Sequence, residues 1–269
     1  MNKKEFIAEI SGKMSEYGEV VERDVVKTNK SYHGLQVNMG VTSPVFDIDD
    51  MYKRYSNGTP VEELYSELET AIRNTPPVPA EINNWEAAKN RLFICTINTE
   101  RNPLVRTEKI AGDIGNAVYL RSPMKGGVAR IQVNDDLLNT WGKTFEEVYA
   151  AAKENTEADE INIFTLGSMF SAADTSAWVV TNNSSLDGFA QATVHSKEIR
   201  DKVGDRFYII PSSIHEALVM PCSDQVDPEA LRAIIRSVNS TMVSEEDFLS
   251  DELFVYTPED GIRVAECAA

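Results

Sequence analysis

The sequence predicts an α+β protein with mixed, mainly antiparallel sheets, joined by hairpins and packed against helices. Three observations support this class. Short runs rich in β-branched residues recur along the chain, and most neighbouring runs flank a polar or Gly/Pro-containing turn. Amphipathic helical segments lie between them without the regular alternation of β-α-β crossovers. A strand–helix–helix unit also occurs twice in the sequence.

Residues 1–75 are predicted to form an opening helix, a hairpin and the first repeat unit. Apolar residues at helical spacing predict a helix over 3–17, and β-branched runs predict a hairpin over 20–28 and 32–39. His33 then faces solvent on the second arm. A strand at 45–48 precedes helices over 49–56 and 59–74, the second with Thr59 as N-cap and Pro60 at its first position. The prolines within 76–79 predict a boundary or an exposed crossover.

Residues 84–157 are predicted to form strands and the second repeat unit. A short helix over 85–89 leads into an apolar strand over 91–97. Residues 99–110 are ambiguous, and a helix after Pro103 is the one alternative that the pattern offers. Strands over 117–121 and 128–133 flank a turn that contains proline and glycine. Helices over 135–141 and 144–155 follow, the second opening with a capping box at Thr144.

The repeat unit is defined by the pattern Gly-x-x-x-Glu-Glu-(Leu/Val)-Tyr, which occupies residues 58–65 and again 142–149. Each copy follows a strand, an acidic pair and a short helix. Recurrence of the whole unit favours duplication, although two unrelated helix starts would produce a similar match.

Residues 158–269 are predicted to form a C-terminal α+β part, so that the chain folds as one compact domain or two. Residues 161–173 are mixed, with a helical turn near 166–170. Runs over 177–181 and 188–194 predict a hairpin, as do 206–210 with 217–220 and 253–257 with 262–265. Helices are predicted over 196–203, 227–238 and from Ser244. One face of the 227–238 helix gathers Ala230, Leu231, Ile234, Ile235 and Val238.

Net charge, apolar run length and cysteine count exclude several classes of protein. The formal net charge of −17 lacks the basic footprint that phosphate-backbone binding requires, so we expect no direct nucleic-acid binding. No apolar run has the length of a signal peptide or a membrane span. Cys95, Cys222 and Cys267 are odd in number, far apart and without a CxxC pair, which argues against a disulfide framework and a structural zinc site. We therefore expect a cytoplasmic protein.

The densest group of reactive side chains lies between two apolar runs within residues 207–221. Its members, Ser212, Ser213, His215 and Glu216, are the candidate catalytic residues. A nucleophilic serine needs a base within hydrogen-bond reach and a carboxylate that orients the base. Neighbours along a strand point to opposite faces, so a structural turn is the favoured interpretation. A hydrolase site and a partner-binding edge are the alternatives.

The sequence predicts no metal site and no cofactor. Three histidines, His33, His195 and His215, are too far apart in sequence for a local ligand motif. The acidic pairs at 49–50 and 135–136 stand at helix starts, where carboxylates cap free N–H groups and complement the helix dipole. The glycine pair at 126–127 lacks the spacing of a phosphate-binding loop.

Several segments together resemble an uncharacterised family of bacterial proteins, associated with anaerobic gut lineages and mobile elements. These segments are FICTINTERN, WVVTNNSSLDGFA, FYIIPSSIHEALVMP and VNSTMVSEEDFLSDELFVY. The resemblance covers most of the chain and is most specific in the C-terminal third. Residues 106–120 depart from it, because RTEKIAGDIGNAVYL stands where the family carries a basic-aromatic motif and a long apolar run. The resemblance implies a shared fold and no particular activity.

The leading functional hypothesis is a non-enzymatic factor, accessory or regulatory, that binds another protein and belongs to a mobile element or phage. Strong acidity and the repeated scaffold motivate it. One alternative is an acidic mimic of nucleic acid that inhibits a defence nuclease. The other is a hydrolase that uses Ser212 or Ser213 with His215.

Overall fold

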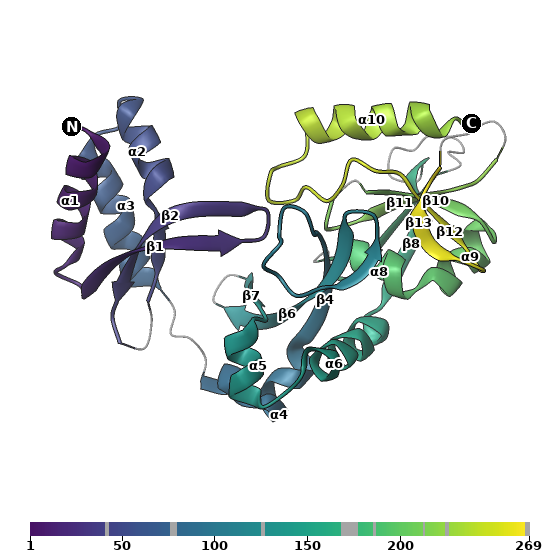
Figure 1. The fold of residues 1–269 in the computed structure, drawn as a ribbon, viewed down its shortest axis with the longest axis horizontal. Helices are drawn as coiled ribbons and strands as arrows, with labels where there is room; N and C mark the ends of the chain where they lie inside the picture. Colours follow the sequence, from purple (N-terminus) through teal and green to yellow (C-terminus); the bar gives the residue numbers. More distant parts are fainter. Residues whose placement is uncertain are drawn as a thin grey trace. The chain divides into compact units, whose positions relative to one another are not determined.

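The predicted α+β class is confirmed by the computed structural model, which describes residues 1–40, 43–75, 80–124, 127–167, 177–184, 187–211, 213–223 and 226–266. Within these ranges, three sheets form and all the strand pairs are antiparallel. The chain divides into two compact units, residues 1–80 and 81–269 (Figure 1). The proline-rich segment 76–79 lies outside the described residues.

Unit 1 packs three helices against a small sheet of order β1-β2-β3. Its elements are α1 (Lys3–Met14), β1 (Glu19–Lys27), β2 (Lys30–Asn38), β3 (Val45–Asp47), α2 (Ile48–Ser56) and α3 (Val61–Asn74). Its core joins Phe6 and Ile10 of α1, Leu35 of β2, Ile48 of α2 and Leu64 of α3. Apolar residues three and four apart on each helix therefore meet one face of the hairpin.

The β1–β2 hairpin extends beyond the helices of unit 1 (Figure 1). β1 is the outer strand, and seven of its nine residues are exposed. The turn between the strands uses Asn29 at φ 59°, a left-handed conformation that asparagine tolerates better than most residues. The predicted hairpin is confirmed, and one long side of it lies open to solvent.

Helix caps differ in part from prediction. The predicted Thr144 capping box is confirmed, but Thr59 does not cap α3: Pro60 occupies the N-cap and makes no side-chain cap bond. The acidic pairs are not the caps either, because Asp47 caps α2 and Asn134 caps α5. Both pairs fall in the first helical turn, where they still complement the dipole.

Unit 2 begins with a four-stranded sheet in the order β4-β6-β5, with β7 also paired to β6. The strands are β4 (Leu92–Asn98), β5 (Glu108–Ala111), β6 (Ile114–Met124) and β7 (Gly127–Gln132). The accompanying helices are η1 (Ala80–Asn83), α4 (Trp85–Ala88), η2 (Lys89–Arg91), α5 (Asp135–Trp141) and α6 (Phe145–Ala158). One face of this sheet packs on α5 and α6 through Leu92, Ile94, Trp141 and Val148.

The second sheet of unit 2 has the order β13-β12-β10-β11-β9-β8. Its strands are β8 (Ile161–Thr165), β9 (Trp178–Asn182), β10 (Phe207–Pro211), β11 (Ala217–Pro221), β12 (Phe254–Thr257) and β13 (Gly261–Val264). Helices α8 (Phe189–Val194) and α9 (Ser196–Val203) pack on one face, and α10 (Pro228–Thr241) packs on the other (Figure 1). Alternation along β10 divides its residues between these faces, with Phe207 toward α9 and Tyr208 toward α10.

Three predictions for this part are wrong. Residues 188–194 form helix α8 instead of a strand. The prediction failed because a short run that is buried on all sides has no polar periodicity by which a helix can be distinguished from a strand. The segment from Ser244 is a turn, and the buried Phe248 and Leu249 follow it directly. On α10, Ile235 faces the core while Ile234 is 58% exposed, so the predicted five-residue face is divided.

Both predicted repeat segments fold as a strand followed by two helices, namely β3-α2-α3 and β7-α5-α6. Their origin in a duplication stays a prediction. The helical turn predicted near 166–170 falls largely outside the described residues.

Candidate functional site

The predicted candidate residues lie in the loop between β10 and β11, two strands paired from Phe207 with Pro221 to Pro211 with Ala217. Ser212 lies outside the described residues. The hairpin brings Ser213, His215 and Glu216 to one end of the second sheet. Whether they do chemistry depends on the contacts of each side chain.

The Ser213 hydroxyl is engaged within its own turn. It accepts a hydrogen bond from the backbone N–H of His215 at 3.0 Å and donates to the Glu216 carboxylate at 3.2 Å. This is the local pattern by which serine stabilises a turn. The hydroxyl proton is thereby directed toward a carboxylate, whereas a nucleophilic serine directs it toward an imidazole.

The His215 imidazole contacts a carboxylate from a distant part of the chain. Its Nε2 lies 3.2 Å from Oδ1 of Asp247, which belongs to the turn that follows Ser244. Its Nδ1 is buried without a hydrogen-bond partner. The structure therefore gives His215 the carboxylate neighbour of an acid–base pair, although the sequence neighbour Glu216 was the expected candidate.

Backbone contacts fix the loop to its neighbours. The Thr181 hydroxyl of β9 donates to the carbonyl of His215 at 2.9 Å, and the N–H of Phe189 donates to the carbonyl of Ile214 at 3.1 Å. A Cβ on Gly188 would lie 2.1 Å from the His215 carbonyl oxygen, closer than any real contact. Only glycine fits here, so the start of α8 and the candidate loop are packed backbone to backbone.

A buried ion cluster beside the start of α8 is absent from the sequence prediction. It consists of Cys95 on β4, Arg121 on β6, Arg130 on β7, and Asp159 and Asp187 from connecting loops. Asp187 is the centre, because its side chain is fully buried and its two oxygens face the two arginines. We refer to these five residues as the ion cluster.

The sheet register explains why the cluster needs an anion. Arg121 and Arg130 lie directly opposite one another across β6 and β7, and opposed like charges destabilise a sheet. Oδ1 of Asp187 lies 2.8 Å from Nη2 of Arg130, and Oδ2 lies 3.7 Å from Nη2 of Arg121. Among the described residues, neither Asp187 oxygen has a hydrogen-bond partner, so the attraction is mainly electrostatic. Arg121 also approaches Asp159 at 3.6 Å.

Aromatic and sulfur contacts complete the environment of the arginines. The Arg121 guanidinium lies 3.7 Å from the centre of the Phe93 ring, and Nη2 of Arg130 lies 3.3 Å from the Cys95 sulfur. Burial, followed by the charge of Asp187, raises the pKa of the Cys95 thiol well above its ordinary value. The thiol stays protonated, so Cys95 is not the activated nucleophile of a cysteine enzyme.

The sequence carries a partial signal for this cluster. The predicted hairpin over 117–121 and 128–133 already sets Arg121 near Arg130. Two facing arginines on predicted neighbouring strands require an anion, but sequence spacing does not identify which of 43 acidic residues supplies it.

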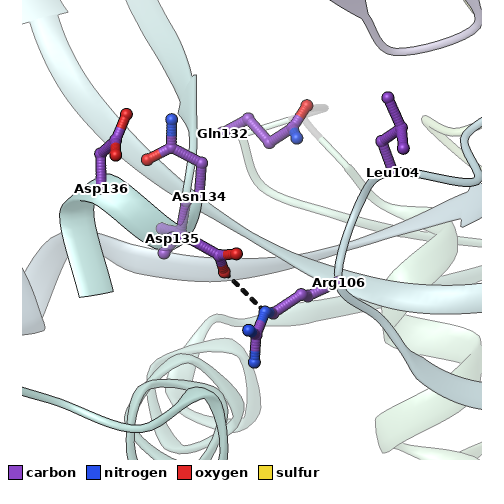
Figure 2. Close-up of a pocket in the computed structure, with 7 residues that line it drawn as sticks. Leu104, Arg106, Gln132, Asn134, Asp135 and Asp136 are labelled. Atoms are coloured by element: carbon purple, nitrogen blue, oxygen red, sulfur yellow. Dashed lines mark ion pairs between the residues drawn. The ribbon is translucent and has the colours of Figure 1, made fainter. Parts of the chain in front are cut away.

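A surface cleft of about 210 Å³ lies at the start of α5, next to the loop that carries Leu104 (Figure 2). Nε of Arg106 contacts Oδ1 of Asp135 at 2.6 Å and bridges the loop to the helix. The Asn134 side chain accepts a hydrogen bond from the N–H of Leu137 as the helix cap. Arg106, Asp135 and Asn134 thus have structural roles at the start of α5.

The described ranges show neither a metal-binding cluster nor a membrane-spanning helix. They contain no group of three or more His, Cys, Asp or Glu side chains that is arranged to hold a metal ion. They also contain no helix that is long and apolar enough to cross a membrane.

Neither the curated proteins nor the solved structures yield a match to this chain. A model of a family of unknown function, DUF5688, matches residues 2–258, which is nearly the whole chain. The predicted resemblance to an uncharacterised family is thus confirmed, and the protein belongs to the DUF5688 family.

Proposed function

We propose that this protein acts by binding another protein, as an accessory or regulatory factor of a bacterial mobile element or phage, and that β1 is its docking edge. The observation that carries the proposal is the long free side of β1. An outer strand presents a row of backbone N–H and C=O groups that a partner strand can pair with. Val21 and Val26 add apolar area, being 40% and 43% exposed.

Charged residues usually protect such an edge from pairing. On β1, however, contacts hold the central charges toward β2. Arg23, the central residue of β1, donates to the Gln36 side chain at 2.7 Å. This contact draws the guanidinium toward the paired side of β1, which supports the use of β1 as a docking strand.

Glu22 and Asp24 are held in the same way by one histidine. Nε2 of His33 lies 2.8 Å from Glu22, and its Nδ1 lies 3.0 Å from Asp24. Both carboxylates are thus paired with β2, the strand that carries His33, while their side chains stay 55% and 91% exposed. The outer side of β1 retains the valines and its backbone groups as the main recognition elements.

The test is affinity capture from a bacterial lysate at low and high salt, with wild type and the V21K/V26K variant. A matched control, Ile234→Lys, adds a cation at an exposed apolar position of α10. We expect a partner that wild type and control retain and that V21K/V26K loses. Equal capture by all three proteins would refute β1 as the docking edge. Loss of the partner only at high salt would favour the acidic-mimic alternative.

The His215–Asp247 contact supports a second candidate, the hydrolase that uses Ser212 or Ser213 with His215. An imidazole oriented by a carboxylate is the base that such a mechanism requires. The test is hydrolysis of a panel of esters, peptides and phosphoesters by wild type and by His215→Ala. Equal activity of the two proteins, including no activity in either, would eliminate this candidate.

A further inference from the structure

We propose that β1 pairs antiparallel with β1 of a second copy of this chain, about a two-fold axis through Arg23. This inference rests on the proposed function and names the partner. Its basis is the residue pattern EVVERDVVK along the exposed edge strand Glu19–Lys27.

A two-fold interface must be self-complementary, because each residue that contacts a second residue is contacted by it in return. An axis through Arg23 pairs each of the four residues before Arg23 with one of the four residues after it in the second copy. Three of these four kinds of pair are complementary in charge or in apolar character. The matching pairs are Glu19 with Lys27, Val20 with Val26, and Val21 with Val25.

Strand geometry favours this register over its neighbours. Side chains alternate between the faces, so residues opposite one another across the copies must belong to the same face. A slip to the next allowed register sets valines against charged residues. A slip in one direction also sets Glu22 opposite Glu22 of the second copy, and a slip in the other direction sets Asp24 opposite Asp24 of the second copy. The register about Arg23 alone pairs the valines with valines.

The fourth pair, Glu22 with Asp24, and the central Arg23 with itself are like-charged. The intramolecular contacts already described reduce their repulsion, because His33 binds both carboxylates and Gln36 binds the guanidinium. Each of these partners is on β2 and therefore draws the charge away from the joining edge. The hairpin thus compensates internally for the charges that do not match across the axis.

The resulting assembly is a continuous sheet. Each copy contributes the order β1-β2-β3, and β1 joins β1 at the centre. A two-fold axis perpendicular to the sheet keeps α1, α2 and α3 of both copies on the same face. Because one strand edge buries less area than a standard interface, we expect reversible association that depends on protein concentration.

Sedimentation velocity over a concentration series tests the inference. We expect wild type to pass from monomer to dimer, and V21K/V26K to stay monomeric. E19K alone and K27E alone each turn two symmetric attractions into repulsions, so each should weaken the dimer about tenfold. The double variant E19K/K27E restores opposite charges and should return the dissociation constant to within about threefold of wild type.

The charge exchange separates an interface effect from a folding effect, since a misfolded hairpin would not be rescued by a second substitution. Ile234→Lys serves as the control and should dimerise like wild type. A monomeric wild type that still captures a partner through β1 would overturn this inference and leave the proposed function intact. A monomeric wild type without β1-dependent capture would refute both. A dimer that is indifferent to the exchange would refute the register.

Discussion

Replacing Asp187 with asparagine isolates the electrostatic role of the ion cluster. The substitution preserves shape and removes the charge. It also respects the backbone, because Asp187 has φ 56° and asparagine, like aspartate, tolerates this left-handed conformation. Any loss of stability then reports the unpaired charges of Arg121 and Arg130.

The magnitude follows from the geometry of the cluster. Two unit charges 4 Å apart attract by about 4 kcal/mol at an effective dielectric constant of about 20. Asp187 lies 2.8 Å and 3.7 Å from the two arginines, whose side chains are 22% and 13% exposed. Removing one member of a buried pair costs about 3–5 kcal/mol. Partial exposure of the arginines and the remaining contact of Arg121 with Asp159 favour the lower end, about 3 kcal/mol.

Urea unfolding monitored by tryptophan fluorescence is the suitable assay. All three tryptophans, Trp85, Trp141 and Trp178, lie in unit 2, so the signal reports the unit that contains the cluster. The control is Glu67→Gln in unit 1, which breaks the exposed pair with Arg54. It should lower the free energy of unfolding by less than about 1 kcal/mol. Because unit 1 has no tryptophan, its unfolding is monitored by far-UV circular dichroism. A loss below about 1 kcal/mol for Asp187→Asn would refute the assignment of Asp187 as the stabilising anion.

Three further predictions concern single positions. Gly188→Ala should destabilise unit 2 by about 3 kcal/mol through overpacking, whereas Gly12→Ala, with open space around it, should stabilise α1 by about 0.5–1 kcal/mol; equal effects in urea unfolding would contradict both. Cys95 should resist alkylation in the native protein, because burial raises the pKa of its thiol, and Cys222, which is only partly buried, should react sooner; peptide mass spectrometry gives the order. Asp24, then Glu22, raises the pKa of His33, so His33 stabilises unit 1 fully below its unfolded pKa of about 6.5 and loses this effect as pH rises through the folded value. An NMR titration of His33 that gives the ordinary value or a lower one would disprove this.

The elements that the sequence predicted well are those with a strong local signal. The β1–β2 hairpin, the Thr144 capping box and the amphipathic α3 depend on residues within a few positions of each other, and spacing suffices to define them. Predictions failed where packing overrides the local pattern, as in α8. Its Phe189 and Ala190 are buried on every side, so no polar face distinguishes helix from strand.

The candidate loop shows the same division. Sequence alone identified Ser213, His215 and Glu216 as the densest polar group and predicted their turn. Tertiary structure decided the partner of the imidazole, because Asp247 reaches His215 only after α10 and the following turn have packed. The same holds for Asp187, whose position between two arginines depends on the register of β6 and β7. Local sequence patterns thus determined such elements as the β1–β2 hairpin and the Thr144 capping box. Long-range packing decided which charges meet, since electrostatic partners are selected by distance in space and not along the chain.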